Sequence, residues 1–351
     1  MAILVTGGAG FIGSAFVHAW CAQSPEPIVT LDLLTYAGNL DNLATLPEAA
    51  PHRFVRGDVR DPGTLRRLLD EVQPRAIVHF AAETHVDRSI KGADAFVSTN
   101  VGGTACLLQA CTDHLGERSH AERSGFRFIH VSTDEVFGSL SPDEPAFHRA
   151  SHYRPNSPYA ASKAAADHLV RAWHVTHGLP TITTHCSNNY GPRQFPEKLI
   201  PLCIARATAG ESIPIYGDGR QVRDWLHVDD HCAALRAVLE QGVPGSTYLI
   251  GGHGECANID LVRSLCGALD EARPTSAPHA SLIRFVTDRP GHDRRYAIDA
   301  SSTRDELGWA PRHSLTDGLR ETVRWYLTNE VWLERIRSGA YASWVREQYG
   351  P

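Results

Sequence analysis

The sequence predicts an α/β protein built on a doubly wound parallel sheet, with a smaller α/β domain beside it. Three observations support this fold class. Short apolar runs alternate with helical stretches through the first half of the chain. The apolar runs are continuous rather than alternating, which is typical of parallel strands covered on both faces. The length of 351 residues, against a typical domain of about 150, corresponds to roughly two domains.

The first half contains six predicted strands and four predicted helices. The strands are expected at residues 3–6, 28–31, 53–55, 76–80, 126–132 and 181–186. The helices are expected at residues 11–22, 65–72, 100–114 and 158–177. The polar stretch 114–125 is predicted to be a surface loop or a frayed helix end. This order of elements is the order of a parallel sheet with crossover helices.

The pattern loosens after residue 187. Prolines, glycines and short segments are expected to dominate up to about residue 300, followed by helices near 303–308 and 315–328. We therefore expect residues 1–187 to form the first domain, with later segments near 220–255 shared with its sheet. Residues 188–351 are expected to form mainly the second domain.

Composition excludes several classes of protein. Hydrophobic residues make up 42%, charged residues 21%, and the formal net charge is −6. An acidic balance argues against binding to nucleic acid or an anionic membrane. No apolar run reaches the ~18 residues of a membrane span, and the N-terminus lacks the basic region of a secretory signal. We expect no nucleic-acid partner, no membrane and a cytoplasmic location.

The cysteines and histidines give no metal-binding pattern. Eight cysteines are scattered without a CxxC spacing, which is typical of free thiols in a reducing compartment. His227 and His231 stand at i, i+4, a spacing that can hold a metal on one helix face. No third ligand stands at a supporting spacing, and Asp229 and Asp230 are better explained as the start of a helix after a strand. No metal is expected.

A glycine-rich turn follows the first predicted strand directly. Gly7, Gly10 and Gly13 form a GxxGxxG pattern that leads into the first helix. Glycines permit a tight turn and a close backbone approach to a pyrophosphate, and the helix N-terminus attracts its negative charge. Asp32, at the end of the second strand, is placed to bind both hydroxyls of a ribose and disfavours a 2′-phosphate. The sequence therefore predicts a Rossmann-type domain that binds NAD rather than NADP.

Asp58 follows the third predicted strand and has two interpretations. It is placed either to face the adenine of the dinucleotide or to cap its own loop.

The predicted helix 158–177 carries a YxxxK pair. Tyr159 and Lys163 lie at i, i+4 and therefore on one helix face. Ser157 is a suitable N-cap, and Pro158 suits the first helical turn. A lysine beside a tyrosine favours the phenolate by charge, which predicts a base able to accept a hydroxyl proton during hydride transfer.

The fifth predicted strand runs into Thr133, Asp134 and Glu135. The carboxyl ends of strands face the ligand in open α/β sheets. Thr133 is placed to hydrogen-bond a reacting hydroxyl. Two adjacent acids exceed what alcohol oxidation needs, because the tyrosine already supplies a base. They indicate a second proton-transfer step with one acid and one base, or, alternatively, two solvated carboxylates at the start of a loop.

At these residues the sequence resembles the extended short-chain dehydrogenase/reductase superfamily and, more narrowly, the dTDP-glucose 4,6-dehydratases. Matching segments span nearly the whole chain in order: TGGAGFIGS (6–14), LTYAGNL (34–40), AAETHVDRSI (81–90), STDEVFG (132–138), SPYAASKAAADHLVRAW (157–173), NNYGP (188–192), FPEKLIP (195–201), IPIYGDGRQVRDWLHVDDH (213–231) and DRPGHDRRYAID (288–299). The resemblance implies an NAD-binding first domain and a second domain that mainly binds a nucleotide sugar.

The resemblance implies a lyase that converts dTDP-glucose to dTDP-4-keto-6-deoxyglucose and water in three steps. Tyr159 takes the proton of the 4-hydroxyl while hydride leaves C4 for NAD⁺, with Thr133 and Lys163 assisting. Glu135 then removes the C5 proton, and Asp134 protonates the departing C6 hydroxyl. Hydride then returns from NADH to C6 and C5 is reprotonated, so the cofactor ends as NAD⁺.

The resemblance also implies two sets of binding residues. The cofactor set is Gly7, Gly10, Phe11, Ile12, Gly13, Asp32, Leu33, Thr35, Asp58, Val59, Phe80, Ala81, Ala82, Thr99, Tyr159, Lys163 and Asn189. The substrate set is Thr84, Thr133, Asn188, Lys198, Leu199, Pro214, Ile215, Tyr216, Arg223, Asn258, Arg289 and His292. Within it, Arg223 and Arg289 suit a pyrophosphate by forked hydrogen bonding, and residues 214–216 are expected to form the base pocket.

Some features depart from the pattern or stay open. Phe137 replaces the family's usual tyrosine, and we expect a packing change there. The region 115–152 is shorter than in many relatives. The resemblance implies a homodimer built from helices near 100–114 and 158–176. The alternatives are a dehydratase for another nucleotide sugar, a 4-epimerase, which needs no acid–base pair for elimination, and a non-enzymatic dinucleotide sensor, a type of protein that usually lacks the tyrosine–lysine pair.

Overall fold

A seven-stranded sheet organises the first part of the chain. The computed structural model describes residues 2–116 and 118–337. The strands of this sheet are β1 (Ala2–Thr6), β2 (Ile28–Asp32), β3 (His52–Arg56), β4 (Pro74–His79), β5 (Arg127–Thr133), β6 (Thr181–Cys186) and β10 (Thr247–Ile250). Their order is β10-β6-β5-β4-β1-β2-β3, and every neighbouring pair is parallel. The predicted Rossmann-type parallel sheet is therefore confirmed.

The order of the strands reverses direction beside β1. From β1 the chain moves outward through β2 and β3, then crosses back to β4 and continues through β5 and β6. In open parallel sheets this switch point leaves a crevice at the carboxyl ends of the strands. The ends of β1, β2, β4 and β5 therefore define where a ligand site is expected.

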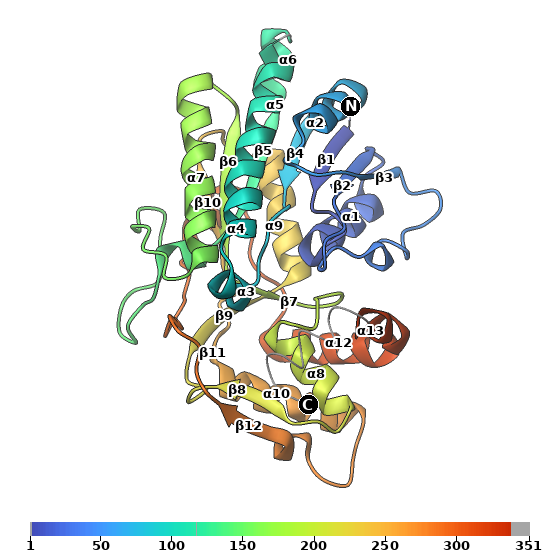
Figure 1. Cartoon of the computed structure of the whole chain (residues 1–351), viewed down its shortest axis with the longest axis vertical. Helices are drawn as coiled ribbons and strands as arrows, with labels where there is room; N and C mark the ends of the chain where they lie inside the picture. Colours follow the sequence, from blue (N-terminus) through green and yellow to red (C-terminus); the bar gives the residue numbers. More distant parts are fainter. Residues whose placement is uncertain (1, 117, 338–351) are drawn as a thin grey trace.

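Helices cover both faces of the sheet (Figure 1). On one face lie α1 (Phe11–Gln23), α9 (Val228–Gln241) and α11 (Ser301–Leu307), which pack around Phe16, Leu235 and Leu249. On the other face lie α2 (Pro62–Val72), α5 (Thr104–Gly116) and α7 (Pro158–His177), which pack around Leu65 and Leu107. Burial of continuous apolar strands between two helical layers is the main source of stability in such a sheet.

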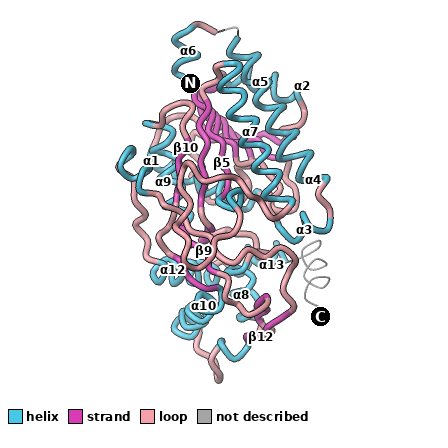
Figure 2. Tube along the Cα trace, turned by 90° about the vertical axis from the view of Figure 1, so that its left-hand side faces the viewer, coloured by secondary structure: helices cyan, strands magenta, loops and turns pink. Residues whose placement is uncertain are grey.

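A second, smaller part lies beyond the carboxyl ends of the strands (Figures 1 and 2). Its strands form two small sheets, β11-β9-β7 and β12-β8. The bounds are β7 (Asn188–Tyr190), β8 (Ile213–Tyr216), β9 (Val222–His227), β11 (Glu255–Ala257) and β12 (Ile283–Val286). Its helices are α8 (Leu199–Thr208), α10 (Asn258–Ala272), α12 (Leu315–Thr328) and α13 (Glu330–Arg337). They share an apolar cluster that includes Ile204, Leu265 and Val323.

The remaining elements are short. They are α3 (Val86–Lys91), α4 (Asp94–Phe96), α6 (His120–Gly125), and the turns η1 (Leu40–Asn42), η2 (Val97–Gly103), η3 (Asp134–Phe137) and η4 (His279–Leu282). Among the described residues, no helix is both long and apolar enough to cross a membrane.

Two predictions of local structure differ from what is observed. The predicted helix 100–114 is π-helical over Val97–Gly103 and α-helical only from Thr104. The stretch 114–125, expected to be a surface loop or a frayed helix end, contains the exposed helix α6. Ser119 and Glu122 form a capping box at the N-terminus of this helix. Of the predicted second domain, residues 338–351 lie outside the described residues.

Short segments were expected to dominate residues 188–300, but this range contains two long helices, α9 and α10. In α10, Ile259, Val262, Leu265 and Leu269 are buried. Their spacing is the one expected for a helix with one apolar face. The signal was therefore present in the sequence, although the prolines and glycines on either side obscure it.

Gly138 ends the turn that follows β5, at a position where the neighbouring backbone leaves no space for a side chain. Its φ of +85° lies in the left-handed region, and an added Cβ would stand 2.3 Å from the Arg154 carbonyl oxygen. Gly178, at φ +66°, has open space around the same position. We predict that Gly138→Ala lowers the free energy of unfolding by about 1–3 kcal/mol more than Gly178→Ala, measured by urea denaturation. Equal losses would contradict the predicted clash.

Candidate active site

The glycine turn brings the backbones of β1, α1 and β4 together. Gly7 has a φ of +72°, and an added Cβ would lie 2.6 Å from the Ala81 nitrogen. An added Cβ on Gly13 would lie 2.3 Å from the Gly7 carbonyl oxygen. Gly10 occupies the N-cap of α1 without a capping side chain, and the first turn of this helix has no acid. The positive end of the α1 dipole therefore faces the crevice, and no acidic side chain of the helix's own first turn neutralises it.

Asp32 ties the end of β2 to this turn. Its carboxylate accepts hydrogen bonds from the Ala9 nitrogen at 3.0 Å and the Leu34 nitrogen at 2.8 Å. Burial raises the pKa of Asp32, and these two hydrogen bonds oppose that effect. The predicted juxtaposition of the glycine turn and the acid of the second strand is thus present.

Asp58 caps its own loop, as one of its two interpretations predicted. It closes its own loop by accepting a hydrogen bond from the Arg60 nitrogen at 2.8 Å, and it pairs with the Arg60 guanidinium at 2.6 Å. That hydrogen-bonded guanidinium lowers the pKa of Asp58. The same residue also lines the crevice.

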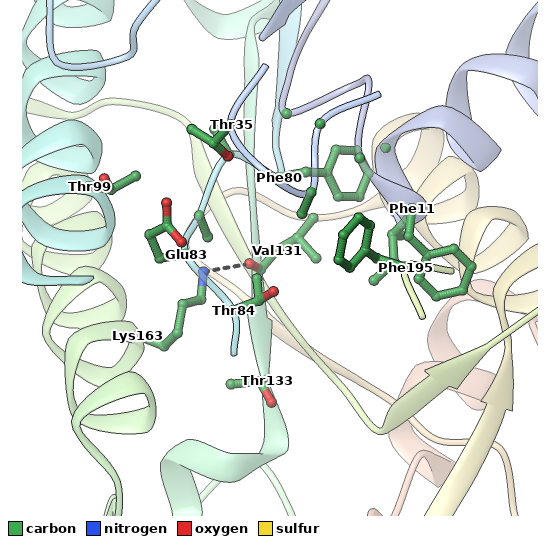
Figure 3. A pocket seen from close by; sticks show the side chains of 18 of the residues that line it. Phe11, Thr35, Phe80, Glu83, Thr84, Thr99, Val131, Thr133, Lys163 and Phe195 are labelled. Atoms are coloured by element: carbon green, nitrogen blue, oxygen red, sulfur yellow. Dashed lines mark hydrogen bonds between the residues drawn. The ribbon is translucent and has the colours of Figure 1, made fainter. Parts of the chain in front are cut away.

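The crevice is a cavity of about 410 Å³ (Figure 3). Every residue of the predicted cofactor set lines it, from Gly7 to Asn189. The three acid–base candidates Thr133, Asp134 and Glu135 line it as well, together with Thr84, Asn188 and Lys198 of the predicted substrate set. The remaining predicted substrate residues are absent from this lining; they are Leu199, Pro214, Ile215, Tyr216, Arg223, Asn258, Arg289 and His292.

Several lining residues were not named from the sequence. They are Leu31, Ala37, Gly38, Gly57, Arg60, Ala95, Val131, Ser132, Cys186, Ser187, Gln194, Phe195 and Glu197, while Glu83, expected from the resemblance only as a supporting group, lines the cavity as well. Ala37, Gly38, Glu83, Phe195 and Glu197 lie within segments that match the family pattern. The match of each segment to the family pattern was the only sign in the sequence that these residues belong to the site. Which of them face the cavity is visible only in the folded structure.

Helix α7 presents Tyr159 and Lys163 to the cavity. Ser157 caps the helix by accepting from the Ala160 nitrogen, and Pro158 occupies the first turn, as predicted. Lys163 Nζ donates to the Val131 carbonyl oxygen at 2.9 Å (Figure 3). The Tyr159 ring packs edge-on to Phe96.

Lys163 was predicted to lower the pKa of Tyr159 by its charge, but burial has the larger effect on that pKa in this structure. Burial raises the pKa of Tyr159 well above its usual value, and the Glu135 carboxylate adds to that increase. Burial likewise lowers the pKa of Lys163. Desolvation disfavours both charged forms, so it outweighs the pairing that the YxxxK spacing suggested.

Asp134 and Glu135 occupy unequal environments in the turn after β5. Asp134 is 1% exposed, and its Oδ2 has no hydrogen-bond partner among the described residues. Burial raises the pKa of Asp134 far above its usual range, and Glu135 adds to this. Burial also raises the pKa of Glu135, but Arg289, Lys198 and Arg223 oppose the increase. The site therefore favours the neutral acid more strongly at Asp134 than at Glu135, where three cations stabilise the carboxylate.

Arg223 is held by the loop that approaches the acid–base pair from the second part of the chain. Its guanidinium donates to the Val222 and Asp293 carbonyl oxygens at 2.8 and 3.0 Å and lies over the Tyr296 ring at 4.2 Å. The Tyr296 hydroxyl in turn donates to the Asp293 carboxylate. Tyr296 and Asp293 were not named from the sequence, although both stand in its last matching segment.

Arg289 pairs with Asp87 across the two parts of the chain. The Arg289 guanidinium donates to Asp87 Oδ1 at 3.0 Å, and the Tyr216 hydroxyl donates to Asp87 Oδ2 at 3.0 Å. The buried Nε of Arg289 has no hydrogen-bond partner among the described residues. His292 Nδ1 lies 2.6 Å from Asp288 Oδ1, and its pKa is lowered to about 4, mainly by burial.

The other predicted substrate residues lie around this junction. Lys198 Nζ donates to the Thr84 carbonyl oxygen at 2.9 Å, which joins two members of the set. Asn258 begins α10, and its buried Oδ1 has no hydrogen-bond partner among the described residues. Pro214 lies in β8 next to Ile215, which packs in the apolar cluster of the second part. Leu199 begins α8 beside Lys198.

Phe137 packs away from the cavity, in an aromatic cluster. Its ring centroid lies 5.1 Å from that of Phe147, 5.3 Å from Tyr153 and 4.9 Å from His185. A side chain in this place shapes the support of the Asp134–Glu135 turn rather than the cavity surface.

One group of possible metal ligands differs from the pair considered in the sequence. His227, Asp229 and His313 offer ligand atoms within 4.8 Å of one another, whereas His231 Nδ1 lies 2.8 Å from the Asn189 side-chain oxygen. The His227 and His313 rings stack with centroids 4.1 Å apart and planes at 25°. Stacked rings point their in-plane lone pairs side by side instead of toward one ion, so we assign no metal to this group.

Fold and cavity together define a short-chain dehydrogenase/reductase of the extended type, with a dinucleotide crevice, a tyrosine–lysine helix and a second part over the crevice. A sequence model of the family described as GDP-mannose 4,6 dehydratase matches residues 4–322. The dTDP-glucose 4,6-dehydratase of Xanthomonas campestris pv. campestris is 56% identical over 340 residues, which cover 96% of each chain. That of Salmonella typhimurium is 50% identical and covers 99% of each chain.

The solved structures agree. The dTDP-glucose 4,6-dehydratase DesIV from Streptomyces venezuelae, crystallised with NAD bound, has a TM-score of 0.86 at 47% identity, covering 96% of this chain and 100% of its own. The chain belongs to the dTDP-glucose 4,6-dehydratase family.

The raised pKa of Asp134 predicts a stability penalty at high pH. A carboxyl whose folded-state pKa exceeds its unfolded value is most favourable below the unfolded pKa of about 3.9, and it destabilises the fold as it ionises on raising the pH. Asparagine has the same shape and does not ionise. We predict that Asp134→Asn raises the free energy of unfolding by about 1 kcal/mol or more at about pH 8, and that the gain vanishes near pH 3.

The measurement is urea denaturation across this pH range, with exposed Asp143→Asn as the matched control. A gain of stability that does not depend on pH would show that Asp134 is not held neutral by the fold.

Proposed function

We propose that this chain is an NAD-dependent dehydratase that converts dTDP-glucose to dTDP-4-keto-6-deoxyglucose and water. The observation that carries the proposal is the pair of adjacent carboxyls in unequal environments, placed beside Tyr159 at the mouth of the dinucleotide crevice. Elimination of water needs one acid and one base, and this pair supplies both. The membership of the chain in the family supports the substrate and the reaction.

The cofactor of the proposed enzyme is NAD. The glycine turn and the N-terminus of α1 suit its pyrophosphate, and the carboxylate of Asp32 suits a ribose with both hydroxyls free. NAD supplies the acceptor and donor of hydride, and DesIV was crystallised with it bound. Because the hydride returns to the sugar, the reaction needs no added reductant.

The protein's own groups move the protons. Tyr159 accepts the proton of the sugar 4-hydroxyl as its phenolate, the form that burial disfavours and that a positive charge on the neighbouring Lys163 favours, with Thr133 beside it. The resulting 4-ketone acidifies the C5 proton, and Glu135 removes it as a base. Asp134, neutral because it is buried, donates its proton to the C6 hydroxyl, which leaves as water. When the hydride returns to C6, a proton is returned to C5. This division of roles follows the unequal environments of the two carboxyls.

The second part of the chain is proposed to hold the nucleotide. Arg223 and Arg289 carry the charge that a pyrophosphate requires, and the geometry keeps both near the acid–base pair, because both lower the pKa of Glu135. Residues 214–216, Leu199 and Asn258 are proposed to contact the base and sugar. We retain residues 1–187, with segments near 220–255, as the cofactor-binding domain, and residues after 188 as mainly the sugar-binding domain.

Two further features are proposals about the protein in its setting. A homodimer through α5 and α7 is proposed from the resemblance, since both helices lie side by side on one face of the sheet. A cytoplasmic location suits the eight cysteines, none of which forms a disulfide.

The direct test is to incubate the purified protein with dTDP-glucose, without reductant, and to weigh the product by mass spectrometry. We expect the loss of one water with no net formation of NADH. An unchanged mass with conversion to the galactose isomer would indicate 4-epimerase chemistry, and no conversion at all would contradict the proposed substrate.

The roles of the two carboxyls are tested by Glu135→Gln. We expect dehydration to fall by a factor of about 10²–10⁴, the usual contribution of a positioned acid or base, because the C5 proton has no acceptor. The first NADH formed in a single turnover, seen at its absorbance band, is expected to persist. Tyr159→Phe is the matched comparison, and it is expected to remove that NADH signal too. Dehydration at the wild-type rate in Glu135→Gln would show that another group is the base.

A further inference from the structure

A buried polar network lies behind Lys163, on the side away from the cavity mouth. At its centre is Asp167, which is 4% exposed. Its carboxylate accepts a hydrogen bond from Ser132 Oγ at 2.9 Å and lies 3.0 Å from His185 Nε2 and 3.1 Å from His130 Nε2. The mechanism above uses none of these four residues. A carboxylate is costly to bury unless its charge has a partner, so this network needs an explanation.

Asp167 continues the catalytic face of α7. Tyr159, Lys163 and Asp167 follow one another at i, i+4 and i+8, so they line one face of the helix over successive turns. Lys163 Nζ donates to the carbonyl oxygen of Val131, and Asp167 accepts from the side chain of Ser132, the next residue of β5. The helix is thus fastened to the end of β5 by two adjacent polar contacts, immediately before the Thr133–Glu135 turn.

The surroundings of Lys163 contain little other negative charge. From the neighbouring strands it is faced by His79 of β4, His130 of β5 and Cys186 of β6, and by Tyr159 on its own helix. Burial lowers the pKa of His130 to about 4 and raises those of Cys186 and Tyr159, so these groups are neutral near pH 7.

Three further carboxyls near this region, those of Glu83, Asp134 and Glu135, line the same cavity as Lys163. Glu83 lines the same cavity (Figure 3), where Arg88 and Arg60 are the cations that lower its pKa, against the effect of burial. Burial raises the pKa of Asp167, but the nearby His130 and His185 rings outweigh that effect and hold the pKa below its usual value, which favours the carboxylate form. Its charge raises the pKa of Lys163, against the effect of burial.

We infer that Asp167 is a positioning residue for the proposed dehydratase, whose buried carboxylate, one turn along α7, keeps Lys163 a cation beside Tyr159. This inference rests on the proposed function only for its catalytic consequence, because the charge of Lys163 can be measured without substrate. The hydrogen bond from Ser132 gives the same carboxylate a second effect, since it holds the strand end that carries the acid–base pair.

The sequence provides a direct readout of the lysine. The chain has three lysines, Lys91, Lys163 and Lys198, so labelling with [ε-¹³C]lysine gives three signals to titrate by NMR. The substitutions Lys91→Arg and Lys163→Met assign them, and the exposed Lys91 serves as the internal reference. In the wild-type protein we expect Lys163 to be protonated at neutral pH although it is buried.

The decisive comparison is between Asp167→Asn and Asp167→Glu. Asparagine keeps the shape of the side chain and loses its charge. We therefore expect the pKa of Lys163 to fall by about one unit or more, because a negative charge one helical turn away no longer stabilises the protonated lysine. We expect the alkaline limb of the pH profile of kcat to move toward neutral pH by the same amount. Glutamate keeps the charge, and it is expected to leave both values close to those of the wild type.

Each outcome decides the inference. An unchanged Lys163 titration in folded Asp167→Asn would overturn it and leave Asp167 a structural residue only. If Asp167→Asn does not fold, the wild-type titration decides, because a Lys163 pKa below 7 there would show that no group keeps the lysine charged. The titration needs no substrate, so a failure of the dehydration assay would contradict the proposed function separately.

Discussion

The exclusion of solvent from the carboxyl end of β5 is the constraint on which the rest of the site depends. Helix α7 packs against this strand so closely that Lys163 bonds to the Val131 backbone and Asp134 is 1% exposed. Desolvation then separates the acid–base properties of two groups that are alike in water. It raises the pKa of Asp134 strongly, whereas three nearby cations oppose the increase in the pKa of Glu135. Two adjacent carboxyls can therefore do opposite work without any other chemical difference between them.

The cofactor side of the cavity depends on close backbone approach instead of burial of charge. The space beside Gly7 and Gly13 is occupied by other backbone atoms, so a side chain at either position would push apart β1, α1 and β4. Asp32 then serves two purposes, because the two backbone N–H groups that it accepts from also fix the conformation of the turn. Structural support and ligand recognition share one carboxylate here, and a substitution of Asp32 would affect both.

Charged contacts help to join the two parts of the chain, beside ring contacts such as that of Tyr36 with Phe195. Arg289 reaches Asp87 from the far part, and Arg223 is held by Asp293 and Tyr296 near Glu135. These guanidinium groups already have partners, so a bound pyrophosphate would compete with the protein's own acceptors. The position of the second part is consequently coupled to the charge state of the site that it covers.

The sequence by itself determined the main strands of the sheet, the glycine turn and the cap of α7, because each depends on local spacing along one segment. Most of the residues expected on the cofactor side of the cavity came from the family resemblance of whole segments instead. The sequence did not show α9 and α10 as long helices, nor that burial would outweigh the pairing of Lys163 with Tyr159. Only the tertiary structure decided which side chains of the matching segments turn inward, and it alone brought Asp167 between His130, His185 and Ser132. The physical reason is that desolvation and long-range contacts depend on neighbours distant in sequence, which no local pattern records.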